Sequence, residues 1–178
     1  MRAALLILAL GIGVASLLTA PPQTVTSGAP LLHGAQVPPD VLTIIERSCQ
    51  DCHSDRTHYP WYSYVAPVSF LIRRDVQRGR ARLNLSHWPE YTLTRRLRFL
   101  SEIANQVQER EMPLPIYTLM HRTARLSDSE IQSLFRWTQT ERLRLITEVG
   151  QAFPPANPPF TATQPSLLPR TPDSGPRP

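Results

Sequence analysis

The sequence predicts an all-α fold, a single small helical domain between two flanks that are rich in proline. Apolar residues in the middle of the chain recur about every 3.6 residues, and no stretch shows the alternation typical of a strand. Of the nineteen prolines, five lie in residues 21–39, nine in 154–178 and only five in 40–153. Because proline breaks helices, this distribution places the helical core in the middle of the 178 residues.

The same boundaries divide the chain into four segments. Residues 1–20 are apolar, 21–39 are expected to be a proline-rich spacer, 40–150 the helical domain, and 151–178 a disordered proline-rich tail.

The apolar N-terminal segment suits either a secretory signal peptide or a short transmembrane anchor. Small residues at Gly13 and Ala15 are compatible with cleavage, so the sequence leaves both alternatives open. Arg2 precedes the segment and favours a cytoplasmic N-terminus. We therefore expect the rest of the chain to be exported, to the periplasm or the outer face of the cytoplasmic membrane.

Four helices are expected in the domain. The first has Asp40 as its N-cap and leads into Cys49, and the second begins at Pro67 and ends near Gly79. A longer helix is expected over 91–110, and the segment Met112-Pro113-Leu114-Pro115 must end it. The last helix begins at Ser127-Asp128-Ser129-Glu130, which has the pattern of a capping box.

The basic side chains are all arginine, and the net charge is +5. The absence of lysine excludes Schiff-base and P-loop chemistry. The positive charge favours anionic partners in general, and we do not expect nucleic acid among them. Arginines between 73 and 82 are expected to form a solvated helix face, of which one or two could pair with carboxylates or meet an acidic partner.

The strongest signal is the run Cys49-Gln50-Asp51-Cys52-His53, which contains both cysteines of the chain. This pattern is the attachment signature of c-type haem. Residues three and four apart share a helix face, so two thiols can form thioethers with the vinyl groups of one haem edge. His53 can then reach the iron as an axial ligand.

Two other readings of this run are less well supported. A thioredoxin-like dithiol requires a βαβ context that the sequence lacks. A zinc site would have to combine the run with His58 or His87, and consecutive Cys52 and His53 fit one tetrahedron poorly.

Met112 is the expected sixth ligand of the iron. It follows a long helix and is held in a stiff loop by Pro113 and Pro115, from which its thioether can approach the open haem face. His121 is the alternative ligand, and core packing is the alternative role for Met112. In the aromatic loop 59–64, either Trp61 or a tyrosine lines the haem pocket and donates a hydrogen bond to a propionate, or the aromatic residues simply pack.

With these residues assembled, the chain resembles a family of bacterial haem-binding domains that carry one Cys-x-x-Cys-His each. The resemblance covers about residues 40–148, and Phe70 and Leu85 depart from it where the family often has tryptophan and phenylalanine. The matching positions are Cys49 to Ser54, Thr57, Tyr59 to Ser63, Ala66 to Ser69, Asp75, Val76, Gly79, Arg80, Leu83, Asn84, Ser86, Trp88, Met112, Pro113, Tyr117, His121, Ala124, Leu126 and Ser127. The resemblance implies a cytochrome c-like helical fold wrapped around one covalent haem, but no particular reaction.

The expected function is therefore that of a monohaem c-type cytochrome, which transfers single electrons outside the cytoplasm and is not an enzyme. The expected partners are haem, a redox protein and, through the N-terminal segment, a membrane. The alternative is a peroxidase-like haem enzyme or a haem-based gas sensor with an open sixth iron position. The ligation of the iron separates these possibilities.

Overall fold

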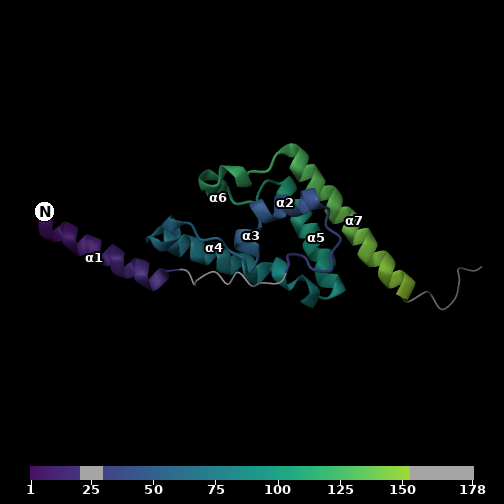
Figure 1. The fold of residues 1–178 in the computed structure, drawn as a ribbon, viewed down its shortest axis with the longest axis horizontal. Coiled ribbons are helices and arrows are strands. Elements are labelled where there is room, and N and C mark those ends of the chain that lie inside the picture. Colours follow the sequence, from purple (N-terminus) through teal and green to yellow (C-terminus); the bar gives the residue numbers. More distant parts are fainter. Residues whose placement is uncertain (21–29, 153–178) are drawn as a thin grey trace, which may run out of the picture.

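The computed structural model describes residues 1–20 and 30–152, and these ranges are helical with no strand (Figure 1). The predicted all-α class is therefore confirmed for the described part of the chain. The α-helices are α1 (Arg2–Thr19), α2 (Pro39–Ser48), α3 (Gln50–His53), α4 (Val68–Arg82), α5 (Leu93–Gln108), α6 (Pro115–Met120) and α7 (Asp128–Ala152). Three short 3₁₀ helices complete the list, η1 (Trp61–Tyr64), η2 (Leu85–Glu90) and η3 (Arg122–Ala124).

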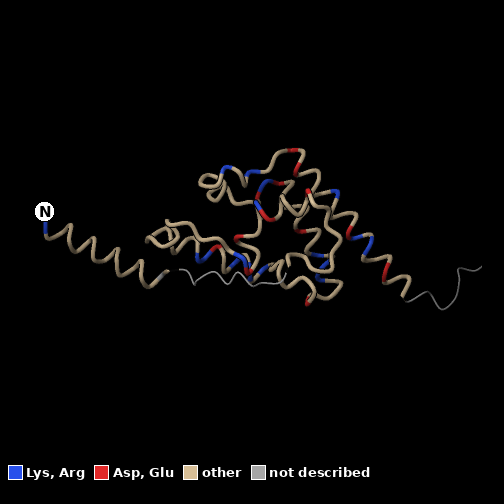
Figure 2. The backbone as a smooth tube through the Cα atoms, viewed as in Figure 1, with Lys and Arg blue, Asp and Glu red and all other residues tan. Residues whose placement is uncertain are grey.

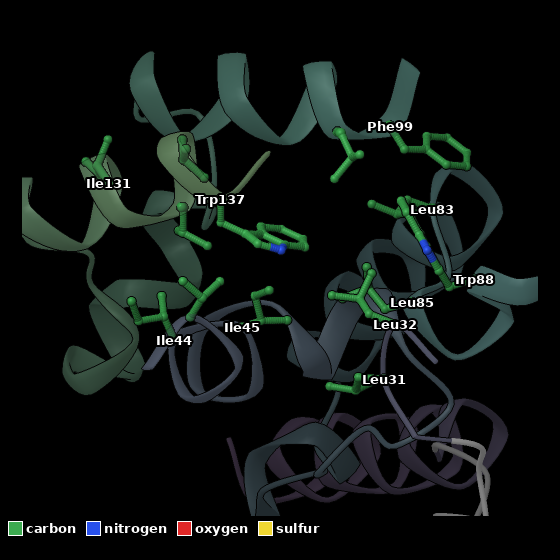
Figure 3. Packing of buried hydrophobic residues seen from close by; sticks show 14 of the residues in the cluster. Leu31, Leu32, Ile44, Ile45, Leu83, Leu85, Trp88, Phe99, Ile131 and Trp137 are labelled. Atoms are coloured by element: carbon green, nitrogen blue, oxygen red, sulfur yellow. The ribbon is translucent and has the colours of Figure 1, made fainter. Parts of the chain in front are cut away.

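The core lies where α5 packs along α7 and α2 crosses α7 (Figure 1). Each helix turns an apolar stripe inward, as its 3.6-residue period requires. Figure 3 shows Ile44 and Ile45 of α2, Phe99 of α5 and Trp137 of α7 gathered in this interior. Trp88 of η2 is completely buried beside them and forms an edge contact with Tyr91.

The predicted helices are present, with corrected ends. Helix α2 begins at Pro39 after the N-cap Pro38, so Asp40 lies in the first turn and is not the cap. Helix α4 continues through Gly79 to Arg82, so this glycine does not end the helix. Gly79 lies where α4 approaches the Cys52 backbone. Helix α5 starts two residues later than expected, where the Thr92 side chain accepts a hydrogen bond from the Arg95 amide.

The capping box of α7 is confirmed. The Ser127 hydroxyl accepts a hydrogen bond from the Glu130 amide at 3.3 Å, and the Ser127 amide donates to the Glu130 carboxylate at 2.8 Å. The break at residues 112–115 is confirmed as well, since α5 ends before it. The sequence did not predict the short helix α6 that starts at Pro115.

Residues 31–37, which the composition assigns to the spacer, pack against the core. Leu31 and Leu32 are buried, and the Leu32 amide donates to the Leu85 carbonyl at 2.9 Å. The Gln36 carbonyl accepts a hydrogen bond from Trp137 Nε1 at 2.9 Å. The rest of the predicted spacer (21–29) and the tail from 153 lie outside the described residues.

The N-terminal segment forms α1, which extends away from the helical core (Figure 1). Its apolar side chains are largely exposed. Within residues 1–20 and 30–152, no helix combines the length and the apolar character needed to cross a membrane.

Candidate functional site

The Cys-x-x-Cys-His run lies at the junction of α2 and α3. Cys49 is both the C-cap of α2 and the N-cap of α3, with backbone angles outside the helical region. The His53 amide donates to the Cys49 carbonyl at 3.0 Å, which closes a single helical turn over these residues. This turn places Cys49, Cys52 and His53 in one short helical segment. That both thiols reach one haem edge stays a prediction.

Two apolar cavities lie beside this turn. The first, about 120 Å³, is lined by Cys49 and His53 together with Met112. Its walls are mostly apolar side chains from α2, α5 and α7. The second, about 260 Å³, lies between α4 and α6 and is lined by Cys52 and His121. The two cysteines therefore contribute to different cavities on either side of one short helix.

The imidazole of His53 is oriented by a backbone carbonyl. Its Nδ1 lies 3.0 Å from the Leu83 oxygen, and a carbonyl can only accept, so Nδ1 carries the proton. Burial lowers the pKa of His53, with the Leu83 hydrogen bond acting in the opposite direction, so the ring is neutral at pH 7. Nε2 is then left with its lone pair, which is the form that binds a metal.

The carbonyl of Leu83 is itself held firmly. The Leu83 amide donates to the Gly79 carbonyl at 2.9 Å as α4 ends. The next amide, of Asn84, donates to the Tyr91 hydroxyl at 3.0 Å, and that hydroxyl donates back to the Asn84 carbonyl at 3.2 Å. Reasoning from the sequence missed Leu83 as a partner of His53, because a backbone acceptor can belong to any residue type.

Gly79 allows α4 to touch the attachment turn. A Cβ added at this position would lie 2.5 Å from the Cys52 carbonyl oxygen and 3.1 Å from its carbonyl carbon. Both are backbone atoms, which cannot rotate out of the way. Gly79 is therefore a positioning residue for Cys52.

Both thiols are free of any disulfide. Burial, followed by the proximity of Cys52, raises the pKa of Cys49 to about 12. Burial, followed by the charge of Asp51, raises the pKa of Cys52 to about 11. Both side chains are consequently protonated thiols at neutral pH.

Met112 is half-buried and shares its cavity with His53. Its amide donates to the Gln106 carbonyl at 3.2 Å, which fixes the loop to the end of α5. His121 lies instead on the second cavity, where its Nε2 is 2.5 Å from the Tyr62 hydroxyl and its ring stacks on Tyr117 at 4.3 Å. Of the two candidate sixth ligands, Met112 is the one that lines the same cavity as His53.

Trp61 is 78% exposed and lines neither cavity. Its neighbour Tyr62 reaches the second cavity instead. A hydrogen bond from Trp61 to a propionate stays a prediction.

The second cavity holds a polar network that sequence reasoning did not identify. The Tyr117 hydroxyl donates to the Asp51 carboxylate at 2.8 Å, and burial raises the pKa of this tyrosine well above its ordinary value. The hydroxyl of Ser63 is buried on the cavity wall without a hydrogen-bond partner in the described residues. Two features of the sequence pointed to this network. One is the aromatic loop 59–64, and the other is Tyr117, which is among the positions that match the haem-binding family.

Among the described residues, no group of three or more histidine, cysteine and acidic side chains gathers to hold a bare metal ion. The zinc alternative is therefore without support in the described part of the chain.

Comparison with known protein families shows which cofactor this site is expected to bind. The sequence model described as "Haem-binding domain" matches residues 8–140, which is well over half of the chain. The chain belongs to the haem-binding domain family. Its match starts inside α1, earlier than the region over which the motifs were recognised. No curated protein and no solved structure matches the chain.

The residues of this haem-binding domain fit the cofactor that the family implies. Two free thiols, an imidazole with an available Nε2 and a thioether sulfur are the side-chain types that attach haem and ligate its iron. The two neighbouring cavities are lined mainly by apolar side chains, as a porphyrin ring requires.

Proposed function

We propose that this haem-binding domain is a c-type cytochrome, which carries one covalent haem and transfers single electrons outside the cytoplasm. When bound, the haem supplies an iron centre that accepts and releases one electron. The protein's own residues would attach the ring, ligate the iron and exclude water.

The observation that carries this proposal is the shared cavity of Cys49, His53 and Met112. Cys49 and Cys52 would attach the vinyl groups through thioether bonds. Each thioether would form by addition of a cysteine thiol across a vinyl group, which would need no oxidant. His53 would offer Nε2 because the Leu83 carbonyl holds Nδ1–H.

Methionine ligation supports electron transfer over catalysis at the iron. His53 and Met112 would hold the iron, and ligation by a histidine and a methionine would raise the reduction potential relative to two histidines. His121, the residue best suited to acid–base chemistry, is already engaged by Tyr62 and stacked on Tyr117. We accordingly propose that the protein is not an enzyme.

The proposed location rests on the apolar segment 1–20 and on Arg2 before it. Thioether attachment through Cys-x-x-Cys-His agrees with an exported chain. The arginine-rich composition, with a net charge of +5, suits an acidic redox partner.

The ligation is tested by optical spectroscopy of the oxidised, haem-loaded protein. We expect the weak methionine-to-iron charge-transfer band, and we expect Met112→Ala to abolish it and lower the reduction potential. Met120→Ala is the matched control, because Met120 lines the other cavity, and it should leave the band intact.

Two results would contradict the proposal. A high-spin spectrum of the unmodified protein, with rapid carbon monoxide binding after reduction, would indicate an open sixth position and favour a haem enzyme or gas sensor. A low-spin spectrum that is lost in His121→Ala and kept in Met112→Ala would assign the sixth position to His121.

A further inference from the structure

An uncharged stretch of sixteen residues, 57–72, forms an exposed apolar surface beside the haem-binding site. It contains η1 and the start of α4. Five of its large hydrophobic side chains are exposed by 41–78%, and one of them, Leu71, lines the second cavity. We call the other four the η1–α4 surface: Trp61, Tyr64, Val65 and Phe70. None of the four lines either of the two cavities, so their exposure does not depend on what the cavities hold.

The η1–α4 surface continues directly into α1. The Ala66 amide donates to the Ser16 hydroxyl at 3.0 Å, and α1 contacts both η1 and α4. Tyr64 lines a shallow hollow together with Leu10, Val14 and Leu17 of α1. Figure 2 shows α1 without charge beyond its first residue, and the adjoining start of α4 is uncharged too.

The apolar character of α1 is not confined to one face. Its exposed side chains include Leu5, Leu6, Ile7, Leu8, Leu10, Ile12, Val14, Leu17 and Leu18. A helix that is apolar on all sides is stable only when it is surrounded by apolar material, such as a protein core or lipid. The η1–α4 surface therefore adjoins a helix that needs such surroundings.

Positive charge follows immediately after the apolar stretch. Arg73 and Arg78 are exposed, and they form no ion pair with the described residues. Asp75 is the single acidic residue of α4, and Arg74 already neutralises it at 3.0 Å. An apolar surface with an arginine border is complementary to a bilayer with anionic headgroups.

We propose that the η1–α4 surface rests in the interface of a lipid bilayer that contains anionic headgroups, with α1 in contact with the same bilayer. Exposed tryptophan and tyrosine favour this environment, because their apolar rings sit among the acyl chains while their polar atoms stay hydrated. The contact would fix one side of the haem-binding domain against the membrane. It does not depend on the electron-transfer role proposed above.

Hydroxyl-radical footprinting of the full-length, haem-loaded protein tests this contact. Oxidation of individual side chains is compared without vesicles, with phosphatidylcholine vesicles, and with vesicles that also contain phosphatidylglycerol. Trp61 and Phe70 report on the η1–α4 surface, and Leu143, which is exposed on α7, is the internal control. We expect oxidation of Trp61 and Phe70 to fall several-fold with phosphatidylglycerol vesicles, relative to Leu143.

Two sets of full-length variants complete the test. Arg73→Gln/Arg78→Gln should reduce the shielding of Trp61 in the anionic vesicles, because it removes the charges next to the headgroups. Phe70→Ser should reduce it by withdrawing an apolar anchor, whereas Leu143→Ser should not.

Unchanged oxidation of Trp61 in protein that is bound to vesicles would overturn the proposal. Shielding that appears without lipid and grows with protein concentration would overturn it as well, in favour of contact with a second copy of the chain. Neither result would bear on the methionine band, so the proposed function would remain separately testable.

Discussion

A backbone oxygen thirty positions along the chain sets the tautomer of His53, the proposed axial ligand. The Leu83 carbonyl accepts from Nδ1, and this leaves Nε2 for the iron. Because the acceptor belongs to the backbone, a substitution of the Leu83 side chain does not remove it. The orientation depends instead on how α4 ends and on how closely α4 approaches the attachment turn.

Gly79→Ala tests that approach. In an ordinary helix position alanine is more favourable than glycine by roughly 0.5–1 kcal/mol. Here the added Cβ would overlap the Cys52 carbonyl, so we expect a net loss of about 1–3 kcal/mol in the free energy of unfolding. Urea unfolding of the haem-loaded protein measures it, together with the yield of attached haem.

Gly150→Ala is the matched control, because nothing lies within 4 Å of a Cβ at that position of α7. It should be neutral or stabilising. Equal behaviour of the two variants would show that the contact between Gly79 and Cys52 does not constrain the site.

Among the contacts between helices, an ion pair links α2 to α7. Glu130, in the capping box of α7, also accepts a hydrogen bond from Arg47 of α2 at 2.8 Å. The backbone hydrogen bond from Ser127 is the main cause that lowers the pKa of Glu130, and Arg47 adds to it. One carboxylate therefore both caps a helix and joins two helices.

Glu130→Gln is expected to cost roughly 1 kcal/mol of stability at pH 7, the usual size of a cap and a partly exposed ion pair. The native pKa lies below the ordinary value of 4.5, so the contribution is complete above that pH and disappears as the pH falls through the native pKa. The difference between the two proteins should thus shrink as the pH is lowered from 7 to well below 4.5. Unfolding in urea at both pH values measures it.

Glu46→Gln, an exposed substitution on α2, provides the control and should change stability little at either pH. A Glu130 effect that stays constant with pH would argue against a role for its charge.

A second link joins α7 to residues 34–36. Glu141 is only 1% exposed, and its carboxylate accepts hydrogen bonds from Arg144 at 2.5 and 2.7 Å and from the Gln36 amide at 3.3 Å. Arg144 also donates to the Gly34 carbonyl at 3.3 Å. This pair holds the described end of the predicted spacer on the core.

Arg144→Met should destabilise the protein by about 3 kcal/mol, because it leaves a buried carboxylate without its partner. Adding Glu141→Gln should recover part of the loss, since the uncompensated charge is removed. Thermal unfolding measures both variants, with Arg136→Met as the exposed control on the same helix. If Arg144→Met alone were as stable as Arg136→Met, the ion pair between Arg144 and Glu141 would not contribute to stability.

For the molecule as a whole, the sequence predicted those features that depend on residues close together in the chain. The Cys-x-x-Cys-His spacing, the capping box at Ser127 and the break after α5 each lie within a few residues, and the family match confirms that the protein binds haem. The site required contacts between distant segments that no local pattern encodes. Tyr62 meets His121 across 59 positions, and His53 meets Leu83 across 30.

Two further features escaped sequence reasoning for the same physical reason. Helix α6 has six residues, too few for a periodic signal. Leu31 and Leu32 look like part of a proline-rich spacer, and only their burial against Leu85 and the rest of the core reveals their role.

The central claim is that Cys49 and Cys52 hold one haem covalently, and mass spectrometry of the denatured protein tests it most directly. The protein is produced in cells that export it and attach c-type haem, then denatured and digested with a protease. The account predicts that the peptide containing residues 49–53 carries the mass of one haem, and that Cys49→Ser/Cys52→Ser removes it. An unmodified peptide from protein that was purified with haem bound would contradict the account.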